Sequence, residues 1–216
     1  MTRPRRFIPL CFALILLLAA ASRAGTPELA AAGLLDVTTL APGIVLDIRY
    51  ATDNNFTGAA VYPLAACYLR ADAAGRLAQV QADLRARGQG LKVFDCYRPF
   101  SIQKKFWALV PDERYVAKPV EDNGRPVAGS KHNRGAAVDA TLVDASGREL
   151  EMPSGFDDFS EKAHRGYPGA SPAAQANARL LEDAMARRGF TGLPTEWWHF
   201  DAAGWESDGL LDAPLN

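Results

Sequence analysis

Two short segments of the sequence carry residue types that bind metal ions. The segment SKHNRGAAVDATLVD places His132 and Asp139 seven residues apart around a glycine, and the segment EWWHF contains His199. The chain has only three histidines among its 216 residues. Two imidazoles and one carboxylate suit a catalytic zinc ion that keeps one position for water. The three residues together predict a metal site.

Each of these residues also has a purely structural interpretation. His132 can be a loop histidine, Asp139 a cap or a member of an ion pair, and His199 a half-buried imidazole satisfied by hydrogen bonds. For any one residue taken singly, that interpretation is the stronger one. Their combination with Glu196, in a chain poor in thiols, favours the metal site.

Glu196 lies three residues before His199 and is a candidate general base. A metal-activated water needs a group that accepts its proton, and a carboxylate can pass that proton to the leaving amine. The alternative is a surface glutamate. In a regular strand, residues 196 and 199 face opposite sides, so either the segment is bulged or turned, or one side chain points elsewhere.

Two further segments suggest a substrate site. In DCYRP, Arg98 follows an expected strand and precedes a proline, where a guanidinium could stabilise an oxyanion or a carboxylate. The alternative is a surface arginine that bonds loop carbonyls. The segment DIRYATDNNFTG, residues 47–58, is polar and turn-forming and by itself suggests only a binding loop.

The elements that must position these residues are helices and strands in mixed order. Apolar spacing predicts a helix from Ala73 to Gly88, a strand over Leu91–Asp95 and a short helix over Ser101–Leu109. We expect residues 111–129 to be irregular. Residues 136–143 alternate as a strand, which puts Asp139 on an otherwise apolar or neutral face.

The best helix of the sequence begins after Ser171, with Pro172 in its first turn, and ends at Gly189. An aromatic, strand-like segment, PTEWWHFD, follows it. The elements lack a regular β-α-β alternation. The sequence therefore predicts an α+β fold with a largely antiparallel sheet flanked by helices.

Composition indicates one globular domain with no polyanion partner. Apolar residues make up 48% of the chain and charged residues 23%, and the formal net charge is -1. Lysines and arginines are spread along the sequence, so a basic footprint for nucleic acid is absent. No repeat or linker divides the chain.

The N-terminus has the pattern of a secretory signal peptide. A basic start precedes an apolar run of about fifteen residues and a small-residue cleavage site, so we expect residues 1–24 to be removed and residues 25–216 to form the exported domain. The alternative is a retained anchor, but the run is shorter than a membrane span needs. Export makes a disulfide between Cys67 and Cys96 more plausible than free thiols or a metal site.

Four segments together carry a resemblance to a known family. SKHNRGAAVD, EWWH, DCYRP and DIRYATDNNFTG, from about residue 34 to 201, resemble the D-alanyl-D-alanine dipeptidases, the VanX-like zinc peptidases. The first two patterns are shared with other cell-wall zinc D,D-peptidases, whereas YATDNNFTG is more specific. The family fold is α+β, with the antiparallel sheet of Hedgehog-like domains.

The resemblance implies one Zn²⁺ per chain, bound by His132, Asp139 and His199, and hydrolysis of a small D,D-dipeptide. It implies that Glu196 is the general base and that Arg98 stabilises the transition state. It further implies a substrate-binding set consisting of Tyr50, Ser130 and Asp157.

The sequence departs from the family pattern in two places. Pro153 replaces the usual glycine before Asp157, and AHR stands where a histidine pair is frequent, which leaves His164 as a structural or surface residue. The expected function is cleavage of D-Ala-D-Ala in wall peptide turnover or salvage. The alternatives are a D,D-carboxypeptidase or related stem-peptide hydrolase, and a non-catalytic zinc-containing binding module.

Overall fold

The computed structural model describes residues 26–215, so the expected signal peptide lies outside the described residues. The helices are α1 (Pro27–Ala31), α2 (Val37–Leu40), α3 (Ala71–Arg85), α4 (Phe100–Leu109) and α5 (Pro172–Ala186). The strands are β1 (Leu34–Asp36), β2 (Val45–Leu46), β3 (Tyr68–Arg70), β4 (Gln89–Asp95), β5 (Val120–Asp122), β6 (Arg125–Ala128), β7 (Ala137–Asp144), β8 (Phe190–Leu193) and β9 (Glu196–Ala202). Short 3₁₀ helices are η1 (Arg49–Ala51), η2 (Lys131–Arg134), η3 (Glu161–Ala163) and η4 (Trp205–Ser207).

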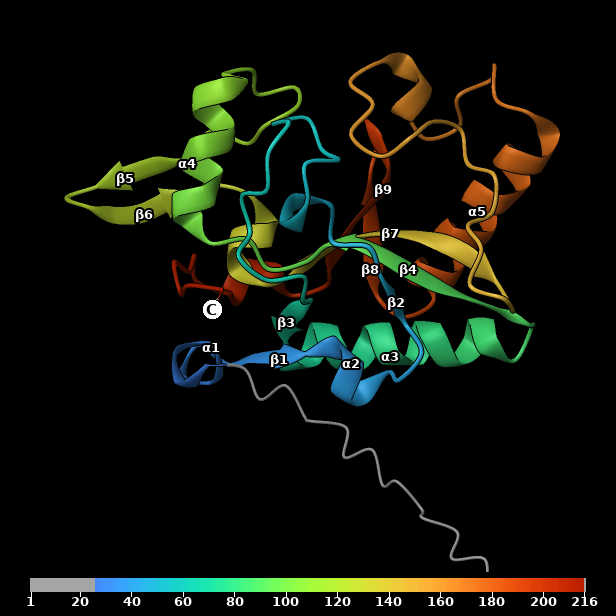
Figure 1. Cartoon of the computed structure of the whole chain (residues 1–216), viewed down its shortest axis with the longest axis horizontal. Coiled ribbons are helices and arrows are strands. Elements are labelled where there is room, and N and C mark those ends of the chain that lie inside the picture. Colours follow the sequence, from blue (N-terminus) through green and yellow to red (C-terminus); the bar gives the residue numbers. More distant parts are fainter. Residues whose placement is uncertain (1–25, 216) are drawn as a thin grey trace, which may run out of the picture.

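The central element is a five-stranded sheet in the order β2-β4-β7-β9-β8. Only the β2–β4 pair is parallel, and the other three pairs are antiparallel. In Figure 1, α3 runs beneath this sheet, while the segments that follow β2 and β7 arch above it. The expected α+β fold with a largely antiparallel sheet is confirmed.

The two long helices form where their sequence patterns predict. In α3, Leu77, Val80 and Leu84 are almost completely buried, as their helical spacing requires. In α5, the Ser171 hydroxyl accepts a hydrogen bond from the Ala174 N–H at 3.0 Å and caps the first turn. These helices cover the apolar side of the sheet and fix the strands that carry the site.

The segment 111–129, expected to be irregular, contains the β5–β6 hairpin, so that expectation was wrong. The hairpin projects from the body of the molecule beside α4 (Figure 1). Its turn is Asn123–Gly124, and both residues have positive φ, 50° and 75°. Asn-Gly favours such hairpin turns, whereas the exposed strands carry no apolar alternation that would reveal them.

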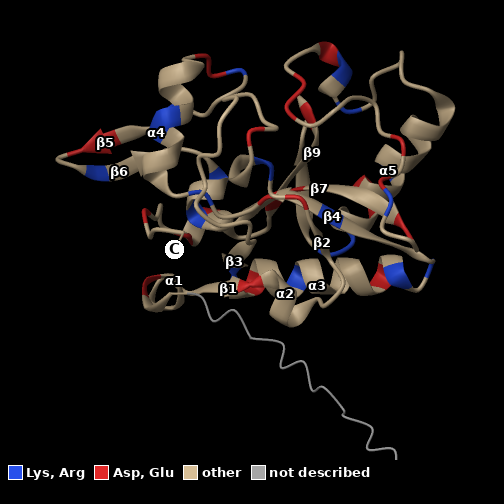
Figure 2. Ribbon diagram, in the orientation of Figure 1, with Lys and Arg blue, Asp and Glu red and all other residues tan. Residues whose placement is uncertain are grey.

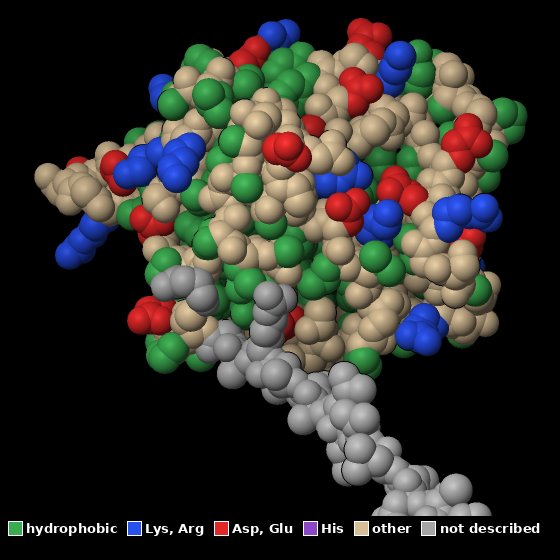
Figure 3. Space-filling view, in the orientation of Figure 1, with side chains coloured by type: hydrophobic (Ala, Val, Ile, Leu, Met, Phe, Trp, Pro, Cys, Tyr) green, Lys and Arg blue, Asp and Glu red, His purple; other side chains and the backbone are tan. Residues whose placement is uncertain are grey.

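Cys67 and Cys96 form a buried disulfide with a Cα–Cα distance of 5.2 Å, so the expected pairing is confirmed. It joins the residue before β3 to the residue after β4. None of the helices within residues 26–215 combines the length and the apolar character that crossing a membrane requires. Basic and acidic residues are interspersed along the ribbon and over the face shown in Figures 2 and 3.

Candidate metal centre and substrate cavity

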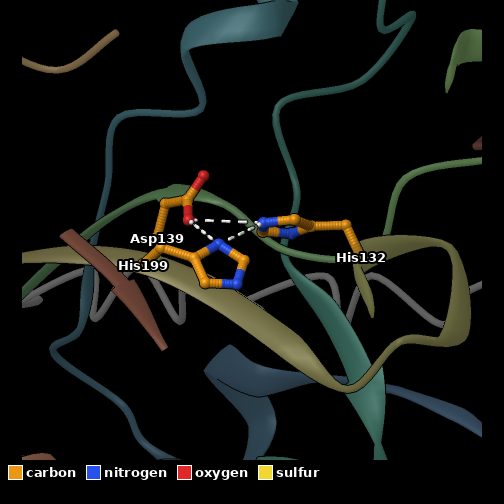
Figure 4. A group of neighbouring side chains, drawn as sticks. All are labelled: His132, Asp139 and His199. Atoms are coloured by element: carbon orange, nitrogen blue, oxygen red, sulfur yellow. Dashed lines mark hydrogen bonds and ion pairs between the residues drawn. The ribbon is translucent and has the colours of Figure 1, made fainter. Parts of the chain in front are cut away.

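Three buried side chains converge on one point between η2, β7 and β9 (Figure 4). His132 Nε2 lies 3.1 Å from His199 Nδ1 and 3.3 Å from Asp139 Oδ1. His199 Nδ1 lies 3.0 Å from the same carboxylate oxygen. Asp139 and His199 are direct cross-strand partners in the β7–β9 ladder. The sheet register therefore sets two of the three donors, and η2 supplies the third.

In each imidazole, the ring nitrogen that faces away from Asp139 donates a hydrogen bond. The Nδ1–H of His132 donates to the Cys96 carbonyl at 2.7 Å, because a carbonyl can only accept. The Nε2–H of His199 donates to Asp201 Oδ1 at 2.8 Å. These bonds leave His132 Nε2 and His199 Nδ1 as lone-pair donors facing Asp139, which is the arrangement that metal-binding histidines show.

The donor set fits a divalent transition metal. Three lone-pair atoms within about 3.3 Å of one another repel unless a cation or a proton lies between them. Imidazole nitrogens suit zinc and related ions better than magnesium or calcium, which prefer oxygen. Burial lowers the pKa of His199, but its hydrogen bonds to Asp139 and Asp201 outweigh this and raise the pKa to about 10. The site is therefore built for a positive charge.

A bulge in β9 brings Glu196 next to these donors. The β8–β9 register pairs Gly192 with Phe200 and then Leu193 with Glu196, so residues 197–199 have no partner on β8. As a result, Glu196 Oε2 lies 3.8 Å from His199 Nδ1. Burial raises the pKa of Glu196, and the nearby Asp139 charge adds to the effect. Of the alternatives that the sequence left open, the structure shows the bulge.

Arg98 is held in a buried network beside the metal-site candidate. Its Nη2 donates to Asp95 Oδ2 at 2.6 Å, and its Nη1 donates to Gln103 Oε1 at 2.8 Å. Tyr62 also donates to Asp95, at 2.8 Å. The Arg98 Nε is buried with no protein partner. One donor of a fixed guanidinium is thus free for a ligand.

Asp157 is a half-buried carboxylate with one unpartnered oxygen. Its Oδ1 accepts a hydrogen bond from the Tyr50 hydroxyl at 3.1 Å, while its Oδ2 is buried without a protein partner. Its φ is 60°, a left-handed conformation that costs a non-glycine residue about 1 kcal/mol or more. Burial raises the pKa of Asp157 to about 7, and the Asp139 charge acts in the same direction.

Ser130 caps the short helix η2 that carries His132. Its hydroxyl caps η2 by accepting a hydrogen bond from the His132 N–H at 3.2 Å. Asn133 completes the capping box, because its side-chain oxygen accepts from the Ser130 N–H at 2.8 Å. This box holds the backbone of the segment that carries His132.

A cavity of about 220 Å³ unites the predicted site residues. All eight of them line it: Tyr50, Arg98, Ser130, His132, Asp139, Asp157, Glu196 and His199. Aromatic side chains, including Phe56, Phe106 and Trp198, form much of the remaining wall. The positions agree with a small, mostly enclosed site for a polar ligand.

A second cavity of about 350 Å³ adjoins the first. Tyr115 and Phe159 line both cavities and stack on each other with ring centroids 4.8 Å apart. His164 is exposed and lines only the second cavity. The aromatic pair therefore bounds the site on the side where His164 lies.

Sequence reasoning missed several residues that support the site, among them Asp95, Gln103 and Asp201. Asp201 had a usable signal, because residues i and i+2 of a strand share a face and His199 precedes it by two. Asp95 adjoins the motif that contains Arg98. Gln103 had no signal, since the turn at Pro99 that starts α4 brings its amide to Arg98.

The fold and the site together define a metallopeptidase, with a buried His-Asp-His donor set beside a half-buried glutamate. The sequence profile of peptidase family M15, described as D-ala-D-ala dipeptidase, matches residues 30–212. The chain belongs to this D-Ala-D-Ala dipeptidase family. This confirms the resemblance carried by its motifs.

Individual relatives agree with the family assignment. The chain is 38% identical to the D-alanyl-D-alanine dipeptidase of Escherichia coli over 168 residues, which cover 78% of this chain and 83% of the relative. It is 32% identical to the Enterococcus faecalis enzyme of the same name, covering 78% and 90%. It is 35% identical to the Streptomyces coelicolor enzyme of the same name, and the match covers 76% of this chain and 88% of the relative.

Proposed function

We propose that this chain hydrolyses D-alanyl-D-alanine to two D-alanines with one zinc ion bound by His132, Asp139 and His199. The convergence of these three donors beside Glu196, in a member of the dipeptidase family, is the observation that carries the proposal. When bound, zinc polarises the scissile carbonyl and lowers the pKa of a water to about 7.

The chain's own residues then move the proton and stabilise charge. Glu196 accepts the proton of the attacking water and delivers it to the amine that leaves, a role that its burial and raised pKa support. Arg98 stabilises the negative charge that develops on the carbonyl oxygen. Its guanidinium is fixed by Asp95 and Gln103 before the substrate arrives, so little reorganisation is needed.

The remaining cavity residues recognise the substrate. The unpartnered Oδ2 of Asp157 accepts the free ammonium, assisted by the Tyr50 hydroxyl, and Ser130 lies near the bound dipeptide. The stacked pair of Tyr115 and Phe159 restricts the length of the ligand. Longer peptides are disfavoured, because they clash with this wall or leave charged groups unpaired.

Metal removal tests the proposal directly. We expect purified protein with one equivalent of zinc to release free D-alanine from D-Ala-D-Ala, chelator to abolish the release, and added zinc to restore it. No release by folded, zinc-loaded protein would contradict the dipeptidase proposal. Cleavage of a pentapeptide stem in preference to the dipeptide would indicate a D,D-carboxypeptidase, and dipeptide binding without turnover a non-catalytic module.

Asp157→Asn should weaken substrate binding more than it slows chemistry. Loss of a charged hydrogen bond costs about 1.5–3 kcal/mol, so we expect KM to rise roughly 10- to 100-fold with a smaller change in kcat. Steady-state kinetics on D-Ala-D-Ala measure both constants. The neighbouring Asp158→Asn is the matched control, because Asp158 lines only the second cavity. An unchanged KM in Asp157→Asn would remove Asp157 from the ammonium site.

The same substitution has a predicted effect on stability. The folded pKa of Asp157 is raised to about 7 from 3.8, so the unfolded chain loses this proton at lower pH and ionisation costs stability as the pH rises. We therefore expect Asp157→Asn to raise the Tm of the metal-free protein at pH 8, with less effect at pH 4. A lower Tm at pH 8 would contradict this sign.

We also propose that the chain is exported and acts in the periplasm or outside the cell, in turnover or salvage of wall peptides. The signal pattern of residues 1–24 supports this, as does the Cys67–Cys96 disulfide, because disulfides persist in oxidising compartments. Cell fractionation tests the idea. Deleting residues 1–24 should remove activity from the exported fraction, and undiminished exported activity would contradict it.

A further inference from the structure

Arg165 lies outside the catalytic cavity but is bonded to the strands that form it. Its side chain is only 13% exposed. Its Nε donates to the Leu193 carbonyl at 2.9 Å, and its Nη2 donates to the His199 carbonyl at 2.6 Å. Its backbone N–H donates to the Pro194 carbonyl at 2.9 Å. One residue thus holds three carbonyls of the β8–β9 hairpin.

These carbonyls lie at the bulge that makes the site possible. The register shift interrupts the ladder after the pair of Gly192 and Phe200, and a bulge disrupts strand hydrogen bonds locally. The guanidinium of Arg165 bridges the interruption, with one bond to β8 and one to β9. Without the bulge, Glu196 and His199 would face opposite sides of the strand.

The residues around Arg165 fit the shape of a planar guanidinium. A Cβ on Gly192 would collide with it, so glycine at this position lets the planar group lie against β8. On another side, the guanidinium lies 4.4 Å from the ring centroid of Phe200. The nearest carboxylate oxygen, that of Glu182, is 3.8 Å away. The cation is therefore compensated mainly by the two carbonyls and the ring.

We propose that Arg165 is a positioning residue that fixes the bulge of β9 and thereby aims Glu196 and the His199 donor into the same cavity. Lysine cannot reproduce this role, because an ammonium lacks the planar fork that reaches two carbonyls at once. The proposal rests on the proposed function for its kinetic consequence. Its effect on metal binding does not depend on which substrate is cleaved.

The test compares Arg165→Ala and Arg165→Lys with Arg188→Ala. Arg188 is the matched control, because its guanidinium also makes a fork, with both oxygens of Asp83 at 2.8 Å, but joins α3 to the end of α5. Zinc affinity is measured by competition with a chromogenic chelator. Steady-state kinetics on D-Ala-D-Ala give kcat and KM, and calorimetry gives Tm.

We expect Arg165→Ala to weaken zinc binding and lower kcat by about 10- to 100-fold each, with KM within a few-fold, as for other groups that orient metal ligands. Arg188→Ala should lower Tm without either change. Millimolar methylguanidinium should restore part of the kcat of Arg165→Ala and none of the loss in any merely destabilised variant. Arg165→Lys should stay impaired.

Gly192→Ala provides a second route if Arg165→Ala fails to fold. It displaces the guanidinium while keeping the arginine, so the same losses in zinc affinity and kcat are expected. The proposal would be overturned if a folded Arg165→Ala or Gly192→Ala variant had the same zinc affinity and kcat as Arg188→Ala. If the wild type binds zinc but does not cleave D-Ala-D-Ala, the zinc affinities still decide the role of Arg165, while the proposed function fails separately.

Discussion

Glu196→Gln is expected to lower kcat on D-Ala-D-Ala by about 10²- to 10⁴-fold, which is the usual contribution of a positioned general base. Glutamine preserves the size of the side chain but cannot accept the proton of the attacking water. Glu196 is not one of the three converging donors, so the variant should keep its zinc. Steady-state kinetics with metal analysis on the same samples check both statements.

The control for this substitution is Glu149→Gln. Glu149 is a surface glutamate that pairs with Lys92 at 3.3 Å and lies outside the cavity. The activity of Glu149→Gln should therefore equal that of the wild type. If zinc-loaded Glu196→Gln retained most of its kcat, another group would have to be the base. If the variant lost its zinc, Glu196 would instead belong to the metal site.

Arg98→Gln is expected to lower kcat by about 10²- to 10³-fold, comparable to the loss of an oxyanion-stabilising donor. It should also lower the free energy of unfolding by about 3–5 kcal/mol, because Asp95 is left buried without its cation. Kinetics and chemical denaturation measure the two effects on the same preparation.

The double variant Asp95→Asn with Arg98→Gln separates the two effects. It removes both charges of the buried pair, so we expect it to recover much of the lost stability but none of the lost kcat. Arg114→Gln is the control for Arg98→Gln. Arg114 is a second arginine of the cavity wall, but its guanidinium is exposed and pairs with Asp112. Recovery of kcat in the double variant would show that Arg98 acts only through stability.

Much of the fold was predictable because its elements have strong local signals. Apolar spacing marked α3 and α5, and alternation marked β7. The β5–β6 hairpin was missed because its strands are exposed and short, although Asn123–Gly124 offered a turn signal. Hairpins on the surface lack the burial pattern on which such predictions depend.

The candidate site was predictable where chemistry is local in sequence. His132 and Asp139 share one motif, and the structure brings them to His199 and into one cavity with Glu196. The supporting residues were less visible. Asp201 had only the spacing of two residues from His199 as a signal, and Gln103 reaches Arg98 only through the turn at Pro99. Arg165 was hidden for a different reason: it bonds backbone carbonyls, whose positions a sequence does not reveal.

The Cys96 carbonyl links the disulfide to the donor set, because it accepts the Nδ1–H of His132. Thiol oxidation and metal occupancy therefore act on the same few atoms, and thermodynamic linkage makes any coupling between them reciprocal. By whatever factor the cross-link strengthens metal binding, bound metal shifts the thiol–disulfide equilibrium towards the disulfide by the same factor.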